Sequence, residues 1–155
     1  MPSSSSPRRP AGSYVTGETL AKLTLRLLAP RYALCRLASG DAIPAWTSEA
    51  RTFLTISRTP DELSIVADEE AVPPELDAAR GYRALRVEGP MPLDLVGVIA
   101  AIAQPLAAAR VPIFPIATYD TDYILVLDAH LAESVAALEA AGHSVIRRNP
   151  SPDAR

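Results

Sequence analysis

Cysteine is nearly absent from this sequence of 155 residues, which contains only Cys35. A single cysteine cannot form an internal disulfide, and this excludes the disulfide-stabilised class of small secreted domain. Cys35 lies in a strand-like pattern, where a free thiol behaves as a small buried hydrophobic group. We therefore expect a cytoplasmic protein with an inert cysteine.

Long apolar runs and an excess of basic residues are also missing. Residues 93–106 are apolar, but the run is too short to span a membrane and is interrupted by Gln104 and Pro105. The first residues carry charge without the apolar segment that a signal peptide needs. The net charge is −3 and the arginines are scattered, so no basic patch for nucleic acid is predicted. Neither a membrane nor a nucleic acid is an expected partner.

The motifs that hold phosphate, activate a serine or bind zinc are lacking as well. The sequence has no Gly-rich phosphate loop, no G-x-S-x-G elbow and no H-E-x-x-H helix. Its two histidines, His130 and His143, are 143 − 130 = 13 residues apart and have no cysteine beside them. We predict no metal site, no cofactor and no catalytic residues.

The composition that remains is typical of a folded globular protein, with 48% hydrophobic and 21% charged residues. The length is sufficient for one compact domain or for two very small modules that share a core. The two ends of the chain, "MPSSSSPRRPAGS" and "RRNPSPDAR", are polar and contain several prolines. Residues 1–19 and 148–155 are therefore predicted to be disordered tails.

Two pairs of similar segments indicate an internal repeat. The segment "ISRTPDELSIV" at 56–66 resembles "IATYDTDYILV" at 116–126, with an offset of 116 − 56 = 60. Upstream, "YALCRL" at 32–37 resembles "YRALRV" at 82–87, with an offset of 82 − 32 = 50. Because both pairs occur in the same order, we predict a duplication in which the first helix of unit one is shortened. The predicted units are residues 20–80 and 81–147.

Each unit is expected to fold as strand, helix, two strands, helix and strand. In unit two, Tyr82–Val87 and the hairpin at 111–128 have strand patterns, whereas the apolar spacing from Leu93 and from Leu131 onwards is helical. Unit one has weaker helices, a short one near Trp46 and a second in "EEAVPPELDAA". This order is that of the ferredoxin-like βαββαβ unit. We expect an α+β protein of two tandem ferredoxin-like units, with antiparallel sheets and helices packed on one face.

The segment "LDLVGVIAAIAQPLAAARVPIFPIATYDTDYILV", residues 93–126, resembles the stand-alone ACT-domain proteins related to the aspartate kinase regulatory domain and to the cytosolic arginine sensors of animals. In that family an acidic-apolar-Gly turn leads into a helix, and a hairpin similar to "STYDTDY" follows. Ala117 stands where the family frequently has Ser, and unit one has no counterpart of Gly97. The resemblance covers residues 20–146 and implies a module that binds amino acids. The matching positions are Leu93, Asp94, Gly97, Pro105 and residues 118–123.

The resemblance implies a ligand site in which the turn before the helix and the turn of the hairpin face one pocket. A helix N-terminus can bind the carboxylate of an amino acid through its free N–H groups. The ammonium needs an acceptor, and a carboxylate makes the stronger, charge-assisted hydrogen bond. Asp122, with the backbone carbonyls around Thr118, is the candidate acceptor. The predicted site residues are Asp94, Leu95, Val96, Gly97, Val98, Thr118, Tyr119, Asp120, Thr121 and Asp122.

Several of these residues also have a purely structural interpretation. Asp120 suits a turn in which the side chain bonds its own backbone, and Asp122 suits a solvated charge at a strand end. Asp94 suits a helix N-cap, and Gly97 allows a helix and a sheet to pack closely. Tyr119 suits partly buried packing with a wet hydroxyl.

The function we expect is non-catalytic sensing of a free amino acid, with output through assembly or through a partner protein. ACT units pair side by side, so the two units can satisfy each other, or the chain can form a homodimer that completes the site. Two other classes of function stay open. One is a structural module that keeps the fold without the site; the other is a small enzyme that uses Asp94, Asp120 and Asp122 as acid–base groups.

Overall fold

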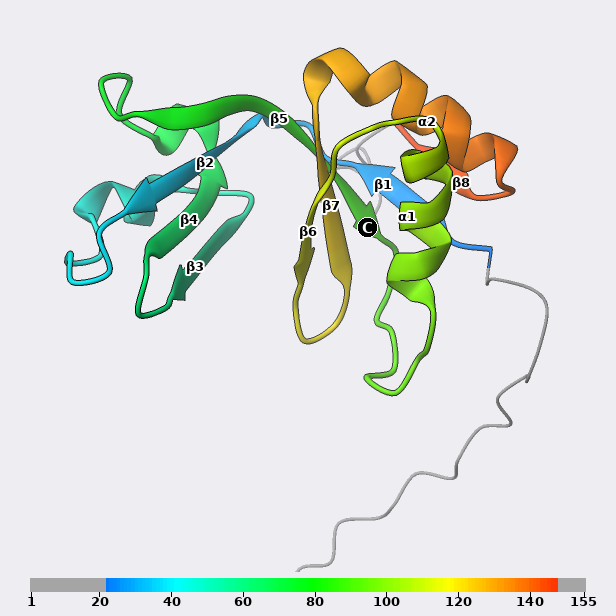
Figure 1. Ribbon diagram of the computed structural model, residues 1–155, viewed down its shortest axis with the longest axis horizontal. Coiled ribbons are helices and arrows are strands. Elements are labelled where there is room, and N and C mark those ends of the chain that lie inside the picture. Colours follow the sequence, from blue (N-terminus) through cyan, green and yellow to red (C-terminus); the bar gives the residue numbers. More distant parts are fainter. Residues whose placement is uncertain (1–21, 148–155) are drawn as a thin grey trace, which may run out of the picture.

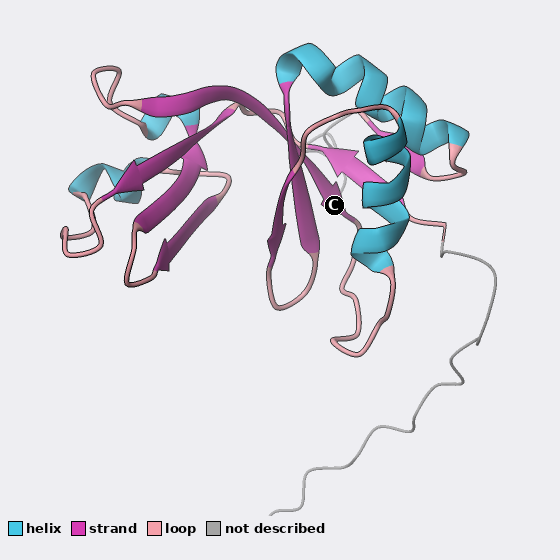
Figure 2. Cartoon of the chain, viewed as in Figure 1, coloured by secondary structure: helices cyan, strands magenta, loops and turns pink. Residues whose placement is uncertain are grey.

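The computed structural model describes residues 22–147, and the tails predicted at 1–19 and 148–155 lie outside this part of the chain. Its α+β fold consists of one eight-stranded mixed sheet and two α-helices (Figure 1, Figure 2). The strands are β1 (Thr24–Leu27), β2 (Tyr32–Leu37), β3 (Leu54–Arg58), β4 (Leu63–Asp68), β5 (Ala78–Val87), β6 (Phe114–Ala117), β7 (Asp122–Leu127) and β8 (Ser144–Ile146). The helices are α1 (Val98–Ala108) and α2 (Leu131–Ala140), with short 3-10 helices η1 (Ala45–Glu49), η2 (Glu69–Ala71) and η3 (Asp128–His130).

The strand β5 belongs to both halves of the molecule. Its first half pairs antiparallel with β2. Its second half lies between β1 and β7, where Leu85 is opposite Leu27 on one side and Ile124 on the other. Figure 1 shows β5 running from β2, β3 and β4 to the strands beside α1. The strand expected at Tyr82–Val87 therefore starts earlier, and the added residues join the two halves.

The strand β1 lies between β5 and β8 in the sheet. It is antiparallel to β5 and parallel to β8. The expected antiparallel pairing thus holds for the strand pairs of residues 22–147 other than β1–β8, and the sheet is mixed. Because β1 completes the sheet of the C-terminal half, the two halves are not simply consecutive along the chain.

Both α-helices cover the same face of the C-terminal half of the sheet. Val98, Ile102 and Leu106 of α1 and Leu138 of α2 pack on this face. Burying an aliphatic side chain of this size stabilises the fold by about 1.5–3 kcal/mol. The strand residues that meet the helices are Leu25, Leu85, Val87, Ile124 and Val126. No helix in the described part of the chain is long and apolar enough to cross a membrane.

The opposite face of β5 and β7 packs against the N-terminal half. Ala84 and Leu125 point to this face and share a core with Tyr32 and Phe53. The Phe53 ring lies 4.4 Å from the ring of Tyr123, centroid to centroid, and meets the Tyr32 ring edge-on at 6.1 Å. Aromatic pairs at such separations stabilise by about 0.5–1.5 kcal/mol beyond the burial of their area. The contact holds the two halves together at the site of the shared strand.

The described residues before α1 form no α-helix. The helix predicted near Trp46 is the 3-10 helix η1, which packs over the core of the N-terminal half. The prediction of a second helix at 69–79 is wrong, since only η2 forms there. Pro73 and Pro74 explain this, because proline lacks the N–H that a helix needs and favours extended backbone before it. Cys35 is buried in the same core, and burial raises the pKa of its thiol.

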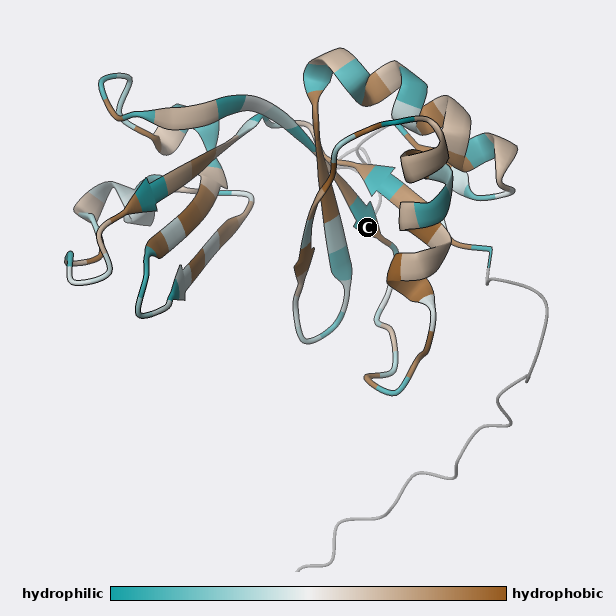
Figure 3. Ribbon diagram, viewed as in Figure 1, coloured by the Kyte–Doolittle hydropathy of each residue, from teal (hydrophilic) through white to brown (hydrophobic). Residues whose placement is uncertain are grey.

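The helix α1 begins at Val98, later than the apolar pattern from Leu93 predicts. Gly97 has a φ of 89°, a left-handed conformation that a right-handed helix does not contain and that glycine adopts readily. Leu93 and Val96 therefore lie in a loop, where they are 72% and 83% exposed. Figure 3 shows the hydrophobic colour along this loop. Pro105 is accommodated inside α1 without ending it.

His143 fastens the beginning of β1 to both helices. The backbone N–H of Leu23 donates to His143 Nδ1 at 3.1 Å, and Nε2 lies 3.0 Å from the carbonyl oxygen of Ala101 in α1. Because Nδ1 is an acceptor, Nε2 carries the proton and donates to that carbonyl. Gly142, which precedes the histidine, has a φ of 91° and follows the end of α2, where glycine is favoured.

Replacing His143 with leucine should destabilise the fold without changing its apolar core. The substitution leaves two buried backbone groups unpaired, and each such group costs about 1–3 kcal/mol. We expect His143→Leu to lower the free energy of unfolding in urea by this amount or more. The half-exposed His130 at the start of α2 offers a control, because His130→Leu should change it by less than about 0.5 kcal/mol. Equal effects of the two variants would contradict this role.

Candidate functional site

The turn between β6 and β7 is fixed by its own threonines. The backbone N–H and the hydroxyl of Thr118 both donate to the Thr121 carbonyl, each at 2.8 Å. The buried Thr121 hydroxyl donates to the Val87 carbonyl at the end of β5, at 2.5 Å. The Met91 N–H donates to the Asp120 carbonyl at 2.8 Å. The hairpin tip is therefore tied to the loop that leads into α1.

The N-terminal end of α1 lies next to this turn, and within residues 22–147 it has no side-chain cap. The first helical hydrogen bond runs from the Ala101 N–H to the Gly97 carbonyl, at 2.9 Å. The N–H groups of Val98, Ile99 and Ala100 precede it and have no intrahelical acceptor. No side chain caps the helix at Gly97. These N–H groups, together with the helix dipole, favour a negative charge at this end.

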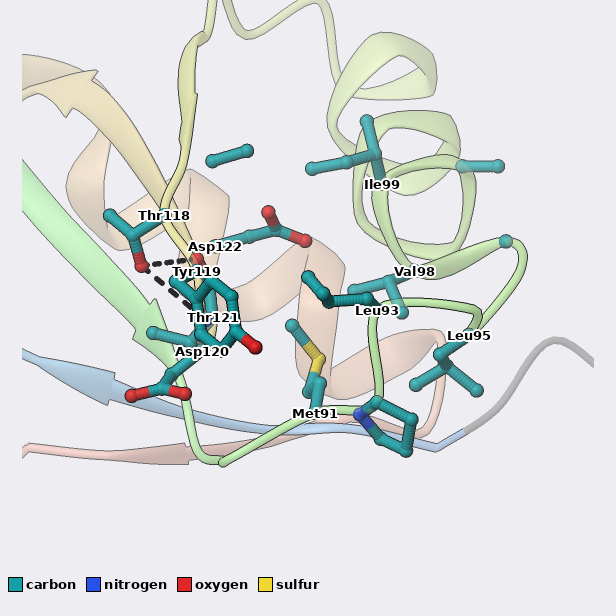
Figure 4. A pocket seen from close by; sticks show the side chains of 14 residues that line it. Met91, Leu93, Leu95, Val98, Ile99, Thr118, Tyr119, Asp120, Thr121 and Asp122 are labelled. Carbon is teal, nitrogen blue, oxygen red and sulfur yellow. Dashed lines mark hydrogen bonds between the residues drawn. The ribbon is translucent and has the colours of Figure 1, made fainter. Parts of the chain in front are cut away.

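A cavity of about 430 Å³ separates the turn from the helix end (Figure 4). One wall is the hairpin tip, residues 117–122. The other wall is formed by the loop and the first turn of α1, through residues 91–93, 95 and 97–100. The cavity lies within the C-terminal half, between two elements that the threonine and Met91 hydrogen bonds hold in place.

The carboxylate of Asp122 points into this cavity. Figure 4 shows it directed from the hairpin towards Ile99 and Leu93, whereas the Asp120 carboxylate points away from the helix. No hydrogen bond or ion pair to the Asp122 side chain occurs within the described part of the chain. Burial raises the pKa of the Asp122 carboxyl above its ordinary value, since desolvation disfavours the charged form. The cavity thus combines one uncompensated carboxylate with a helix end that favours an anion.

The structure places most of the residues predicted for the site around this cavity. Those in its lining are Leu95, Gly97, Val98, Thr118, Tyr119, Asp120, Thr121 and Asp122. Asp94 and Val96 are not in the lining, and Val96 faces solvent. The hydroxyls of Thr118 and Thr121 serve the turn itself. Of the predicted side chains, Asp122 is the one whose charge is directed at the space inside.

Sequence reasoning missed three apolar residues of the lining. Met91 and Ile99 contribute to the wall opposite the hairpin, together with Leu93. The apolar spacing assigned Leu93 and Ile99 to a buried helix face, yet Ile99 is 38% exposed. For Leu93 the signal is Gly97, because a break at this glycine takes the preceding apolar residues out of the helix.

A second cavity, of about 990 Å³, lies in the N-terminal half and is more highly charged. Two of its acidic groups accept backbone N–H groups: Asp68 accepts those of Arg51 and Thr52 at 2.6 and 2.7 Å, and Glu69 accepts that of Gly81 at 2.7 Å. These bonds hold the chain turns around η2. Asp68 and Glu69 therefore have a structural role in this second cavity.

A family model for the ACT domain matches residues 77–140, and a second model, of an N-terminal domain, matches residues 30–75. No curated protein matches the chain with significance. Among solved structures, the chain is similar to a protein from Agrobacterium tumefaciens, with 32% sequence identity and a TM-score of 0.78. This likeness covers 84% of the present chain and 96% of the other. The chain belongs to the ACT-domain family.

Two further solved structures share the fold of this ACT-domain protein. A Vibrio cholerae protein of unknown function, described as a possible transport protein, is 24% identical over 77% of this chain and 90% of that one, with a TM-score of 0.63. The ligand-free regulatory subunit of aspartate kinase from Thermus thermophilus is 14% identical over 72% and 93%, with a TM-score of 0.52. The resemblance seen at residues 93–126 and the ferredoxin-like α+β class are confirmed. Membership of the ACT family indicates a ligand-binding regulatory role.

The raised pKa of Asp122 predicts a pH-dependent stability cost. The folded-state pKa lies above the unfolded one, so ionisation destabilises the fold; the cost is present above the folded pKa and absent below the unfolded value of about 3.9. We expect Asp122→Asn to raise the free energy of unfolding at pH 7 and to have no stabilising effect near pH 3. Urea unfolding at the two pH values measures this.

The matched control for this measurement is Asp120→Asn, two residues away on the same turn. Its carboxylate points to solvent, so the substitution should change the free energy of unfolding at pH 7 by less than about 0.5 kcal/mol. A loss of stability at pH 7 in Asp122→Asn would show that the carboxylate has a stabilising partner in the free protein, contrary to the geometry.

Proposed function

We propose that this ACT-domain protein is a non-catalytic regulator that binds a free α-amino acid in the cavity between the hairpin tip and α1. The observation that carries the proposal is the Asp122 carboxylate, which points into the cavity without a partner and faces a helix end that favours an anion. An α-amino acid carries an ammonium and a carboxylate on one carbon. The two ends of the cavity match these two charges.

The ligand's carboxylate is assigned to the first turn of α1. The N–H groups of Ile99 and Ala100 belong to residues that line the cavity and have no intrahelical acceptor. Anions bind at such helix ends because several N–H groups converge and the dipole adds to the attraction. The left-handed Gly97 lets the backbone come close to the ligand, since no Cβ intervenes.

The ligand's ammonium is assigned to Asp122. A hydrogen bond between an ammonium and a carboxylate is about twice as strong as one between neutral groups. The bound cation also offsets the desolvation of a carboxylate that is half-buried without a partner. The charged form of Asp122 is therefore disfavoured in the free protein and stabilised in the complex, so ligand binding should change the ionisation of this carboxyl.

Binding would couple α1 to the hairpin β6–β7, because the ligand touches both. A ligand shifts a conformational equilibrium only to the extent that its affinities for the two states differ. Here, a state in which the hairpin and the helix are closer together would bind the ligand more tightly. The output passes through a homodimer contact or a protein partner in the cytoplasm. The regulatory subunit named among the similar folds is a precedent for this class of function.

The first test is thermal unfolding of the protein with each of the twenty amino acids at millimolar concentration. A ligand at 100 times its dissociation constant stabilises by about 2.7 kcal/mol, which raises the midpoint by roughly 5–10 °C for a domain of this size. We expect one amino acid or a small group of them to give this shift.

Two aspartate variants decide whether the shift comes from the proposed site. Asp122→Ala should abolish it, whereas Asp120→Ala should retain it, since the Asp120 carboxylate points away from the cavity. Unchanged midpoints with all twenty amino acids would favour a structural module without a ligand. Equal loss in both variants would place the ligand against the whole turn instead of at Asp122.

A further inference from the structure

The side chain of the bound amino acid would meet an apolar wall. Met91, Leu93 and Ile99 line the cavity opposite the hairpin, and Figure 4 shows Leu93 and Ile99 directed towards it. Leu93 is 72% exposed and Ile99 is 38% exposed. Apolar surface of this kind around a cavity marks a place where another apolar group binds.

The charges of the cavity exclude two classes of side chain. Among residues 22–147, the lining contains no lysine, arginine or histidine, so an aspartate or glutamate side chain would lose its hydration without gaining a cation from this part of the chain. The lining contains two acidic residues, Asp120 and Asp122. Asp120 points away, and Asp122 is assigned to the α-ammonium. A lysine or arginine side chain would therefore lack an acceptor of its own.

The two threonine hydroxyls of the cavity already donate hydrogen bonds within the protein. The Thr121 hydroxyl donates to the Val87 carbonyl, and the Thr118 hydroxyl donates to the Thr121 carbonyl. A serine, threonine or glutamine side chain would find no threonine hydroxyl free to donate to it, and Tyr119, which carries the remaining hydroxyl of the lining, is 78% exposed. Polar side chains without a partner in a partly buried site bind poorly, because their desolvation is not compensated.

On these grounds we propose that the cavity selects α-amino acids with an aliphatic side chain, the class of leucine, isoleucine and valine. The inference rests on the proposed function and adds the ligand's chemical class. Each buried methylene contributes about fourfold in affinity. Leucine, with three more side-chain carbons than alanine, should bind tens-fold tighter than alanine.

Isothermal titration calorimetry with the wild-type protein tests the selection directly. Leucine, isoleucine, valine, alanine, lysine, arginine, aspartate and glutamate are titrated separately. We expect the three branched aliphatic amino acids to bind at least about tenfold tighter than the four charged ones. Tightest binding of a charged amino acid would overturn the inference and leave the proposed function standing. Binding of none of the eight would also overturn the inference, and the thermal test with all twenty amino acids would then decide the proposed function separately.

A pair of isoleucine variants locates the selective wall. Ile99→Ser should lower the ratio of leucine to alanine affinity by about tenfold, because it removes apolar contacts that leucine makes and alanine does not. Ile43→Ser is the control: Ile43 is 53% exposed and lies in the N-terminal half, away from the cavity lining. Its leucine-to-alanine ratio should equal that of the wild type. An unchanged ratio in Ile99→Ser would overturn the assignment of this wall.

Discussion

The pairing of β5 with β1, β2 and β7 is the constraint on which the rest of the structure depends. This strand is ten residues long. Its first half pairs with β2 of the N-terminal half, and its second half pairs with both β1 and β7 of the C-terminal half. Its last residue also ends beside the hairpin tip, where the Val87 carbonyl accepts the Thr121 hydroxyl. The same strand therefore joins the two halves and fixes one wall of the candidate site.

The site combines a rigid hairpin with a helix end that is held from the other side. Met91 ties the loop before α1 to the hairpin, and His143 ties α1 to β1. Between these anchors, Gly97 breaks the apolar segment into an exposed loop and a buried helix. This break leaves the N–H groups of the first turn of α1 without intrahelical acceptors and leaves exposed apolar side chains next to the half-buried Asp122. The proposed amino-acid ligand would satisfy both features.

The sequence predicted the hairpin and the helix but not the direction of every side chain. Strand β2 has the bounds of the segment 32–37, which its similarity to the strand pattern at 82–87 had singled out. The helix predicted at 69–79 does not form, because two prolines outweigh a favourable composition. Asp120 and Asp122 are two residues apart, which in a strand would place both side chains on the same face. Asp120 lies in the turn, however, where side chains no longer alternate between the two faces. Tertiary position thus decides which carboxylate enters the cavity.

The most direct test of the central claim is to titrate the Asp122 carboxyl carbon by NMR, in the free protein and with saturating leucine. In the free protein its pKa is raised by burial. An ammonium beside the carboxylate favours the charged form, so the account predicts a lower pKa of Asp122 in the complex than in the free protein. The same pKa in both states, at a leucine concentration that saturates the thermal shift, would contradict the assignment of Asp122 to the ligand's ammonium.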